Sequence, residues 1–284
     1  LVFLCTLVRL FSFLALFAVI RTHPTLPPLP YTTLFRALQA DEKIPAQFIG
    51  EVRMGTTVAT NALLERQGDR TALLITGGFK DALRIAYQNR PDLFAKKIEL
   101  PSLLYEQVVE VKERIAADGE VLIRLDEADL KNSLKGVYAA GIRSVAIVFM
   151  HAYHYTEHER IAAEIARQIG FEQISTSHEV SPLMKLISRG DTTVVDAYLT
   201  PILRRYVDQV TDELGETAVK FMQSNGGLTD ASLFKGKDSI LSGPAGGIVG
   251  AVEVCRRAGI ERMIAFDMGG TSTDVSHFAG EYER

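Results

Sequence analysis

The stretch of sequence that decides the fold is residues 263–276, which read MIAFDMGGTSTDVS. An apolar run ends at Asp267, and a Gly-Gly-Thr turn then leads into a second segment of alternating character. This pattern predicts two strands joined by a tight hairpin over residues 263–278. We expect the hairpin tip to bring together a carboxylate and several free backbone N–H groups.

The tip of this hairpin carries groups that suit a triphosphate. Glycine adopts positive φ readily and lets the backbone approach phosphate oxygens, and threonine adds a hydroxyl. Asp267 and Asp274 are the candidate catalytic residues, and Asp267 is the candidate metal ligand, because a carboxylate here can hold Mg²⁺ through water. The candidate cofactor-binding residues are Gly269, Gly270, Thr271 and Thr273. The alternative is an ordinary Gly-Gly hairpin.

A helix of small residues precedes the hairpin. Residues 241–251 read LSGPAGGIVGA and open a helix that we expect over 243–258, stopped by Gly259. Gly246 and Gly247 on this helix are further candidate cofactor-binding residues. The order of helix and hairpin is similar to the actin-like ATPase fold, a ribonuclease H-like architecture shared by sugar kinases, heat-shock chaperone ATPases and actin. There the helix connects two domains, and the hairpin is the second of two phosphate loops.

Four further blocks make the resemblance more specific. They read MGTTVATNALLE at 54–65, YQNRPD at 87–92, SRGDT at 188–192 leading into DAYL at 196–199, and MQSNGG at 222–227. With these blocks the chain resembles the hydantoinase/5-oxoprolinase family from about Phe48 to Arg284.

The resemblance implies an activity. Family members open a cyclic amide, either 5-oxoproline to glutamate or a hydantoin to an N-carbamoyl amino acid, with ATP and Mg²⁺. A ring amide is a poor electrophile because resonance stabilises it, and phosphorylation of its oxygen would create a leaving group. In two-gene members a separate subunit of the hydantoinase B type completes the hydrolysis.

Residues inside these blocks are candidates for contacting substrate or phosphate. They are Thr56, Thr57, Asn61, Arg90, Arg189 and Asn225. Thr56 and Thr57 precede a helix whose N-terminal N–H groups can hold an anion, but plain capping by Thr56 explains them as well. Arg189 either pairs with Asp191 or faces a cleft, and the sequence does not choose.

The first 36 residues do not fit the family. Residues 1–20 are almost wholly apolar, and by length alone they suit a membrane span or a signal segment. Residues 30–36 read PYTTLFR, which a common sequencing adapter encodes in one frame. We therefore expect residues 1–36 to be extraneous or disordered, and a first phosphate loop to be missing. As a fragment, the chain is then expected to be inactive.

The remaining sequence alternates between predicted strands and helices, which predicts an α/β fold. We expect an N-terminal region of the family at 37–180 and the start of its A domain at 181–284, with the first lobe nearly complete and the second truncated. A long helix is predicted from about Thr192 to Leu214, bent or broken by Pro201.

Charge and cysteine content favour a cytoplasmic enzyme. Beyond residue 36 there are 28 basic and 35 acidic side chains, because Arg9, Arg21 and Arg36 are the only charged residues before it. No basic surface for nucleic acid is indicated, and no membrane partner unless residues 1–20 are genuine. Two cysteines cannot build a disulfide framework, which favours a reducing compartment.

Three histidines lie close together in the sequence and raise the possibility of a zinc site. They are His151, His154 and His158, with Glu157 and Glu159 among them. Their spacing straddles a strand end and a helix start and does not place the imidazoles on one face. We therefore expect solvated loop histidines.

Three functions compete. The first is cyclic-amide hydrolysis. The second is the ATP-using subunit of an acetone- or acetophenone-type carboxylase, which would phosphorylate an enol. The third is a nucleotide-binding module whose hinge motion is the output. Substrate-dependent ATPase activity separates the third from the others.

Overall fold

The structure is a computed structural model, and it describes residues 2–6, 15–19, 51–89, 92, 94, 96–98, 100, 102–215, 217–268 and 273–282. The chain divides into two compact units, which are described separately. Unit 1 comprises residues 1–61 and 205–284, and unit 2 comprises residues 62–204. These units do not coincide with the boundary expected near residue 180, which stays a prediction.

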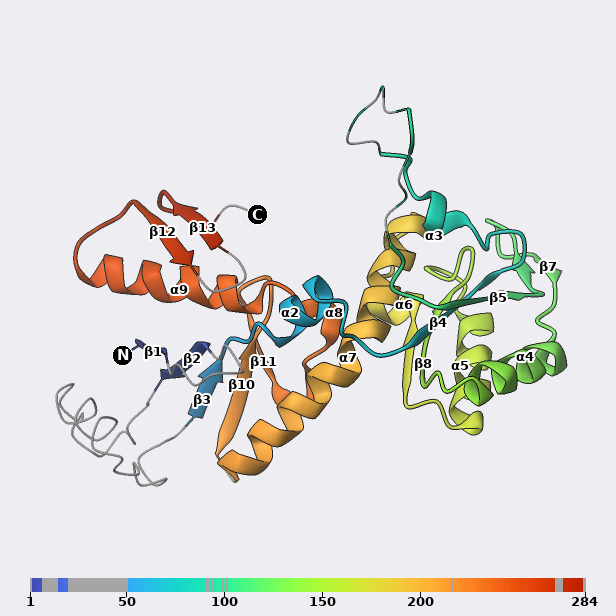
Figure 1. Cartoon of the computed structure of the whole chain (residues 1–284), viewed down its shortest axis with the longest axis horizontal. Helices are drawn as coiled ribbons and strands as arrows, with labels where there is room; N and C mark the ends of the chain where they lie inside the picture. The colour runs from blue at the N-terminus through green and yellow to red at the C-terminus, as the bar shows by residue number, and fades with distance from the viewer. Residues whose placement is uncertain are drawn as a thin grey trace. The chain divides into compact units, whose positions relative to one another are not determined.

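Unit 2 is an α/β unit (Figure 1). Its strands are β4 (Thr71–Thr76), β5 (Gln107–Val111), β6 (Arg114–Ile115), β7 (Val121–Ile123), β8 (Ser144–Val148) and β9 (Gln173–Thr176). Its helices are α3 (Ala82–Ile85), α4 (Glu127–Ala139), α5 (Glu157–Ile169), α6 (Ser177–Val180) and most of α7 (Leu186–Leu214).

A parallel sheet forms the centre of unit 2. Its four strands lie in the order β5-β4-β8-β9, and every neighbouring pair is parallel. Strands β4 and β8 are buried along their whole length, as expected for a parallel sheet covered on both faces. The α/β class expected from the sequence is confirmed.

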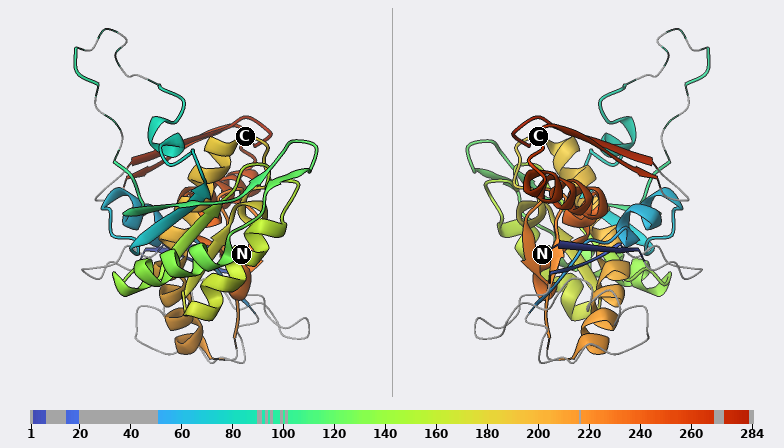
Figure 2. Two further views of the ribbon diagram at one scale, coloured as in Figure 1. Left: turned by 90° about the vertical axis from the view of Figure 1, so that its right-hand side faces the viewer. Right: turned by 90° about the vertical axis from the view of Figure 1, so that its left-hand side faces the viewer.

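The two faces of this sheet bury different clusters. Successive side chains of a strand point to opposite faces. Leu74 of β4 therefore packs with Leu134 of α4 and with α5 residues, whereas its neighbour Ile75 packs with Val194 of α7. Figure 2 gives side views in which the green helices of unit 2 can be followed along the sheet. Helices α4 and α5 cover one face, and α7 covers the other.

Helix α7 begins at Leu186, earlier than the expected Thr192, and continues through Pro201 to Leu214. The proline therefore does not break the helix, and the expected bend stays a prediction. Proline lacks the N–H that would bond to the carbonyl four residues earlier. That carbonyl, of Ala197, instead accepts a hydrogen bond from the Ser144 hydroxyl at 2.6 Å. The next carbonyl accepts from the backbone N–H of Asp69 at 3.0 Å. Tertiary donors thus satisfy the carbonyls around the proline.

The described residues of unit 1 form three small sheets. Its elements are β1 (Val2–Thr6), β2 (Ala15–Val19), β3 (Glu51–Met54), β10 (Ala218–Met222), β11 (Leu228–Asp230), η2 (Ala231–Leu233), α8 (Gly236–Ser239), α9 (Ser242–Arg257), β12 (Met263–Met268) and β13 (Thr273–Phe278). Strands lie in the order β11-β10-β3, with β3 parallel to β10; β1 pairs with β2, and β12 with β13. Helix α2 (Val58–Leu64) begins in this unit.

The apolar N-terminal run does not form a helix where the structure describes it. Residues of this run form the antiparallel strands β1 and β2. Within the described part of the chain, no helix is both long enough and apolar enough to cross a membrane.

Candidate functional site

The β12–β13 hairpin has the bounds that the sequence predicts, 263–278. In its register Asp267 lies opposite Asp274, and Met268 lies opposite Thr273 as the last described pair. Directly opposite residues of an antiparallel pair share one face of the ladder. The two aspartates therefore occupy one cross-strand position next to the tip. Candidate residues Gly269, Gly270 and Thr271 lie outside the described residues, as does the side chain of Asp267.

The two faces of this hairpin differ. Asp274 is on the half-buried face, which ends at the buried Phe278, whereas Ile264, Phe266 and Val275 on the other face are more than 60% exposed. The Arg256 guanidinium of α9 lies 5.1 Å from the centre of the Phe278 ring. Helix α9 thus packs on the face that carries Asp274 and fixes the hairpin from that side.

Helix α9 confirms the expected small-residue helix, with bounds one residue earlier than predicted. Gly246 is buried in the helix. Gly247 borders open space: a Cβ atom at this position would have no atom within 4 Å. A Cβ at Gly243 would lie 2.8 Å from the Thr57 methyl group, so a glycine is needed there for close approach.

Three of the sequence blocks meet in unit 1. The backbone N–H of Thr56 donates to the Ser242 hydroxyl at 3.2 Å, and that hydroxyl donates to the Met222 carbonyl at 2.6 Å. The Thr60 hydroxyl donates to the Ile240 carbonyl. Residues far apart in the sequence, on the β3–α2 loop, the end of β10 and the start of α9, are therefore held together by short polar contacts.

Thr56 acts as a cap in this arrangement. Its hydroxyl is buried and accepts a hydrogen bond from the backbone N–H of Val58 at 3.2 Å. Helix α2 starts at Val58, so one of its free N–H groups is already satisfied. The geometry favours the capping alternative for this hydroxyl. Asn61 lies inside α2, where its N–H donates to the Thr57 carbonyl.

Asn225 shapes the turn that follows β10. Its side-chain oxygen accepts a hydrogen bond from the Gly227 N–H at 2.7 Å, and Gly226 between them has φ of +82°. Only glycine adopts this conformation without strain. The side-chain oxygen of Asn225 therefore serves the turn. Arg90 lies outside the described residues.

Arg189 is fully buried in unit 2, on the first turn of α7. Its guanidinium donates to the Ser177 hydroxyl at 2.9 Å, to the Leu183 carbonyl at 2.7 Å and to the Phe149 carbonyl at 2.6 Å. Burial lowers the pKa of Arg189, and the nearby Glu159 carboxylate opposes that shift. Among the described residues Arg189 and Asp191 form no ion pair, so the structure does not support that one of the two alternatives left open by the sequence.

Two carboxylate–imidazole pairs lie at the carboxyl end of the parallel sheet. His158 Nδ1 is 2.7 Å from Glu113 Oε2, and His178 Nδ1 is 2.6 Å from Glu159 Oε2. Both carboxylates are buried. The prediction of solvated loop histidines is wrong for His158, which is only 7% exposed because helix α5 turns it into the interior.

Glu159 is the most heavily bonded of these groups. It also accepts hydrogen bonds from the Phe149 N–H at 2.9 Å, the Ser177 hydroxyl at 2.6 Å and the His178 N–H at 3.1 Å. No group of three metal-ligating side chains suited to a metal ion occurs in the described residues, so the zinc alternative gains no support there. Sequence reasoning missed Glu113 and His178. Their one signal was their place just after parallel strands, where ligand sites gather.

Comparisons with known proteins identify the family. The hydantoinase/oxoprolinase N-terminal region matches residues 19–170, and the hydantoinase/oxoprolinase domain matches residues 189–284. The chain therefore belongs to the hydantoinase/oxoprolinase family. The first match begins at residue 19, inside the segment that the sequence analysis set apart. The extraneous nature of residues 1–36 stays a prediction.

Individual relatives agree with this assignment. The chain is 45% identical over 266 residues to 5-oxoprolinase 1 of Arabidopsis thaliana. This match covers 85% of this chain and 21% of the relative. The crystal structure of the ATP-dependent caprolactamase from Pseudomonas jessenii superposes with a TM-score of 0.73 at 28% identity, over 93% of this chain and 42% of that one.

A second solved structure shows the same fold. The nucleotide-free structure of acetone carboxylase superposes with a TM-score of 0.75 at 23% identity, over 86% of this chain and 38% of that one. The chain thus has the actin-like ATPase architecture expected from the sequence. It spans about a fifth of the length of 5-oxoprolinase 1.

Proposed function

We propose that this chain is the ATP-using part of an enzyme that hydrolyses a cyclic amide, 5-oxoproline to glutamate or a hydantoin to an N-carbamoyl amino acid. The observation that carries the proposal is the β12–β13 hairpin, in which two aspartates occupy opposite positions beside a Gly-Gly-Thr turn. The family assignment and the 5-oxoprolinase relatives support the substrate class.

We assign Mg²⁺ and a triphosphate to the tip of this hairpin. Carboxylate oxygens and water are the ligands that Mg²⁺ prefers, and the opposite positions of Asp267 and Asp274 in the strand register support these residues as the source of the carboxylates. Thr273 on the exposed face can donate its hydroxyl to a phosphate oxygen. When bound, ATP supplies the phosphoryl group that turns the amide oxygen into a leaving group. The protein's own share is orientation and charge neutralisation.

The turn residues have distinct proposed roles. The N–H groups of Gly269, Gly270 and Thr271 would hold phosphate oxygens. Gly246 and Gly247 lie on the helix that packs beneath the hairpin, and the open space beside Gly247 leaves room for a ligand.

The remaining candidates divide by their bonding. We assign positioning roles to Thr56, Asn225 and Arg189, because each uses its polar atoms on protein groups. Thr57, Asn61 and Arg90 remain proposed substrate or phosphate contacts.

We propose a second subunit of the hydantoinase B type as partner, and the cytoplasm as location. The name of a relative, caprolactamase subunit alpha of Pseudomonas jessenii, describes one subunit of an enzyme, which supports a partner. Cys255 is a free thiol, which is compatible with a reducing compartment.

The binding half of the proposal is tested on the chain itself. We expect calorimetry to detect ATP binding that strengthens with Mg²⁺. Gly270→Val should abolish binding, because a β-branched side chain opposes positive φ, and Asp274→Asn should remove most of the magnesium dependence. His277→Gln, on the exposed face of the same strand, is the matched control. Equal binding by all variants would leave the hairpin as an ordinary turn.

The catalytic half is tested in a full-length relative that carries the same hairpin motif, because this chain by itself is expected to be inactive. A hydantoinase B-type subunit is added to that relative, and ADP release is measured with different substrates. Release that depends on 5-oxoproline or hydantoin supports the proposal. Release that depends on acetone and bicarbonate would instead assign the chain to the carboxylases. ATP turnover that no substrate changes would favour a hinge module.

A further inference from the structure

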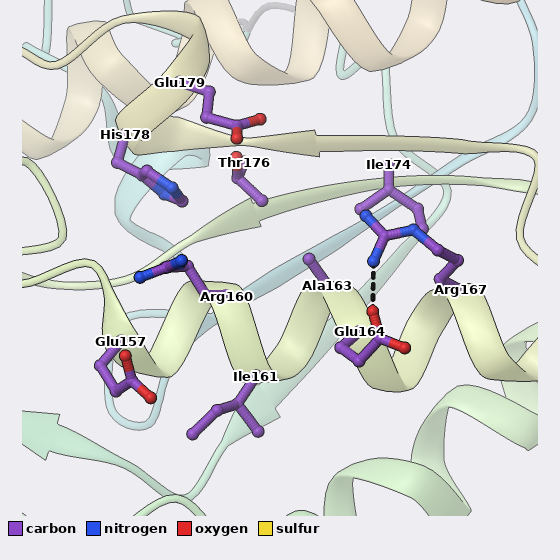
Figure 3. Close-up of a pocket in the computed structure, with 10 residues that line it drawn as sticks. All are labelled: Glu157, Arg160, Ile161, Ala163, Glu164, Arg167, Ile174, Thr176, His178 and Glu179. Carbon is purple, nitrogen blue, oxygen red and sulfur yellow. Dashed lines mark hydrogen bonds and ion pairs between the residues drawn. The ribbon is translucent and has the colours of Figure 1, made fainter.

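A groove on unit 2 is lined by residues of α5, of β9 and of α6, which follows β9 directly (Figure 3). Its volume is about 480 Å³. It is formed entirely within unit 2, whereas the phosphate hairpin belongs to unit 1. The groove therefore requires an explanation of its own.

The first sign of a ligand is Thr176, the last residue of β9. Its side chain lines the groove and the residue is only 4% exposed. Its hydroxyl oxygen has no hydrogen-bond partner in the described part of the chain. Buried hydroxyls are normally paired, because an unpaired one loses its bonds to water without replacement. The hydroxyl oxygen is covered in the structure, and rotation of the Thr176 side chain toward the groove would let a ligand oxygen supply the missing partner.

The second sign is the way His178 is held. Its Nδ1 contacts Glu159, a carboxylate that is fully buried and accepts hydrogen bonds from three other groups. A carboxylate at one ring nitrogen fixes the orientation of an imidazole. The other ring nitrogen, Nε2, is left for a ligand, and His178 is among the residues that line the groove.

The third sign is an unpaired cation. Arg160 on α5 is exposed and forms no ion pair within the described residues, and Figure 3 shows it extending toward the same end of the groove as His178. At the other end Arg167 is paired with Glu164. The free positive charge is thus confined to the end that holds the histidine.

We propose that this end of the groove binds a small oxyanion, a carboxylate or a phosphate group, through Arg160, His178 and Thr176. A guanidinium matches the two oxygens of such a group, and the hydroxyl and the imidazole add hydrogen bonds from the sides. Glu157, Glu164 and Glu179 also line the groove, and Glu164 is paired with Arg167. The charges of Glu157 and Glu179 therefore oppose the binding of an anion, and removal of either charge should tighten it.

The test is calorimetric titration of the full chain with inorganic phosphate and, separately, with succinate. Arg160→Gln should weaken binding about tenfold or more, because it removes a charge-assisted pair. Glu179→Gln should tighten binding, since it removes a repulsion. Arg124→Gln, an exposed arginine outside the groove, is the matched control and should leave the affinity within about twofold.

A site-specific readout separates this groove from the phosphate hairpin. The His178 ring signal in a histidine-labelled NMR spectrum should shift on titration, and the shift should persist in Asp274→Asn. Thr176→Val should weaken binding without lowering the unfolding midpoint, because the methyl group replaces an unpaired hydroxyl. Binding of only one probe identifies the ligand as phosphate or carboxylate. An unmoved His178 signal, or wild-type affinity in Arg160→Gln, overturns the proposal.

Discussion

The Ser144 hydroxyl donates the hydrogen bond that the backbone of Pro201 cannot donate, and the contribution of this bond to the free energy of unfolding can be measured. Ser144 is 1% exposed and Ala197, whose carbonyl it bonds, is fully buried. Water therefore cannot replace the hydroxyl in Ser144→Ala. An unpaired buried carbonyl costs about 1–3 kcal/mol, so we expect the free energy of unfolding of unit 2 to fall by about 2 kcal/mol.

The cost should depend on the proline. In Pro201→Ala the new backbone N–H can donate to Ala197, as in any helix, so the carbonyl no longer depends on Ser144. In that background Ser144→Ala should cost at most about 0.5–1 kcal/mol, the net value of a second hydrogen bond. The two substitutions should therefore couple by about 1–2 kcal/mol.

The double-mutant cycle is measured by urea denaturation followed by far-ultraviolet circular dichroism, because the chain contains no tryptophan. Amide hydrogen exchange of β8 and of the α7 residues up to Arg204 reports unit 2 alone, which matters because two compact units can unfold separately. Ser102→Ala, at an exposed site in the same unit, is the control. If Ser144→Ala costs the same in both backgrounds, the hydroxyl does not replace the missing donor.

Two further predictions follow from local geometry. Gly68→Ala should lower the free energy of unfolding by about 1–3 kcal/mol, because its Cβ would lie 2.2 Å from the buried Tyr198 ring. Gly136→Ala, in open space on α4, should raise the free energy of unfolding by about 0.5–1 kcal/mol. Urea denaturation that changed both free energies in the same direction would contradict this. Burial raises the pKa of Tyr206 from 10.0 to about 12, so the tyrosine loses its proton at a lower pH in the unfolded chain than in the folded one, and the free energy of unfolding falls as the pH rises from 10 to 12. In Tyr206→Phe the free energy of unfolding should fall less over this range. Parallel plots of unfolding free energy against pH for the variant and the wild type would refute the assignment.

Much of the fold could be predicted because the signals are local. The hairpin at 263–278 has the predicted bounds, since alternation and glycine turns act within a few residues. The small-residue helix expected over 243–258 lies within one residue of those bounds, because glycine stops a helix locally.

The misses share a different cause, which is partners distant in sequence. The continuity of α7 through Pro201 depends on Ser144, and the burial of His158 depends on Glu113, 45 residues away. No periodicity or motif joins such pairs. The sequence placed His158 near a helix start. It could not show that the Glu113 carboxylate, which follows another strand, would form a hydrogen bond with the buried imidazole and so offset the cost of its burial.

Bonding, rather than residue type, separates framework from candidate site in unit 2. Arg189 and Glu159 have the residue types of an active centre, yet their polar atoms are used on protein groups, which fixes the loops at the carboxyl end of the sheet. Arg160 and Thr176 are ordinary surface and strand residues by type, but among the described residues the Arg160 side chain has no ion pair and the Thr176 hydroxyl has no hydrogen-bond partner. A rigid, fully bonded framework is what allows a few unpaired groups to stay in place without a ligand. The buried Glu159 connects the two classes, because it belongs to the framework and orients the groove histidine.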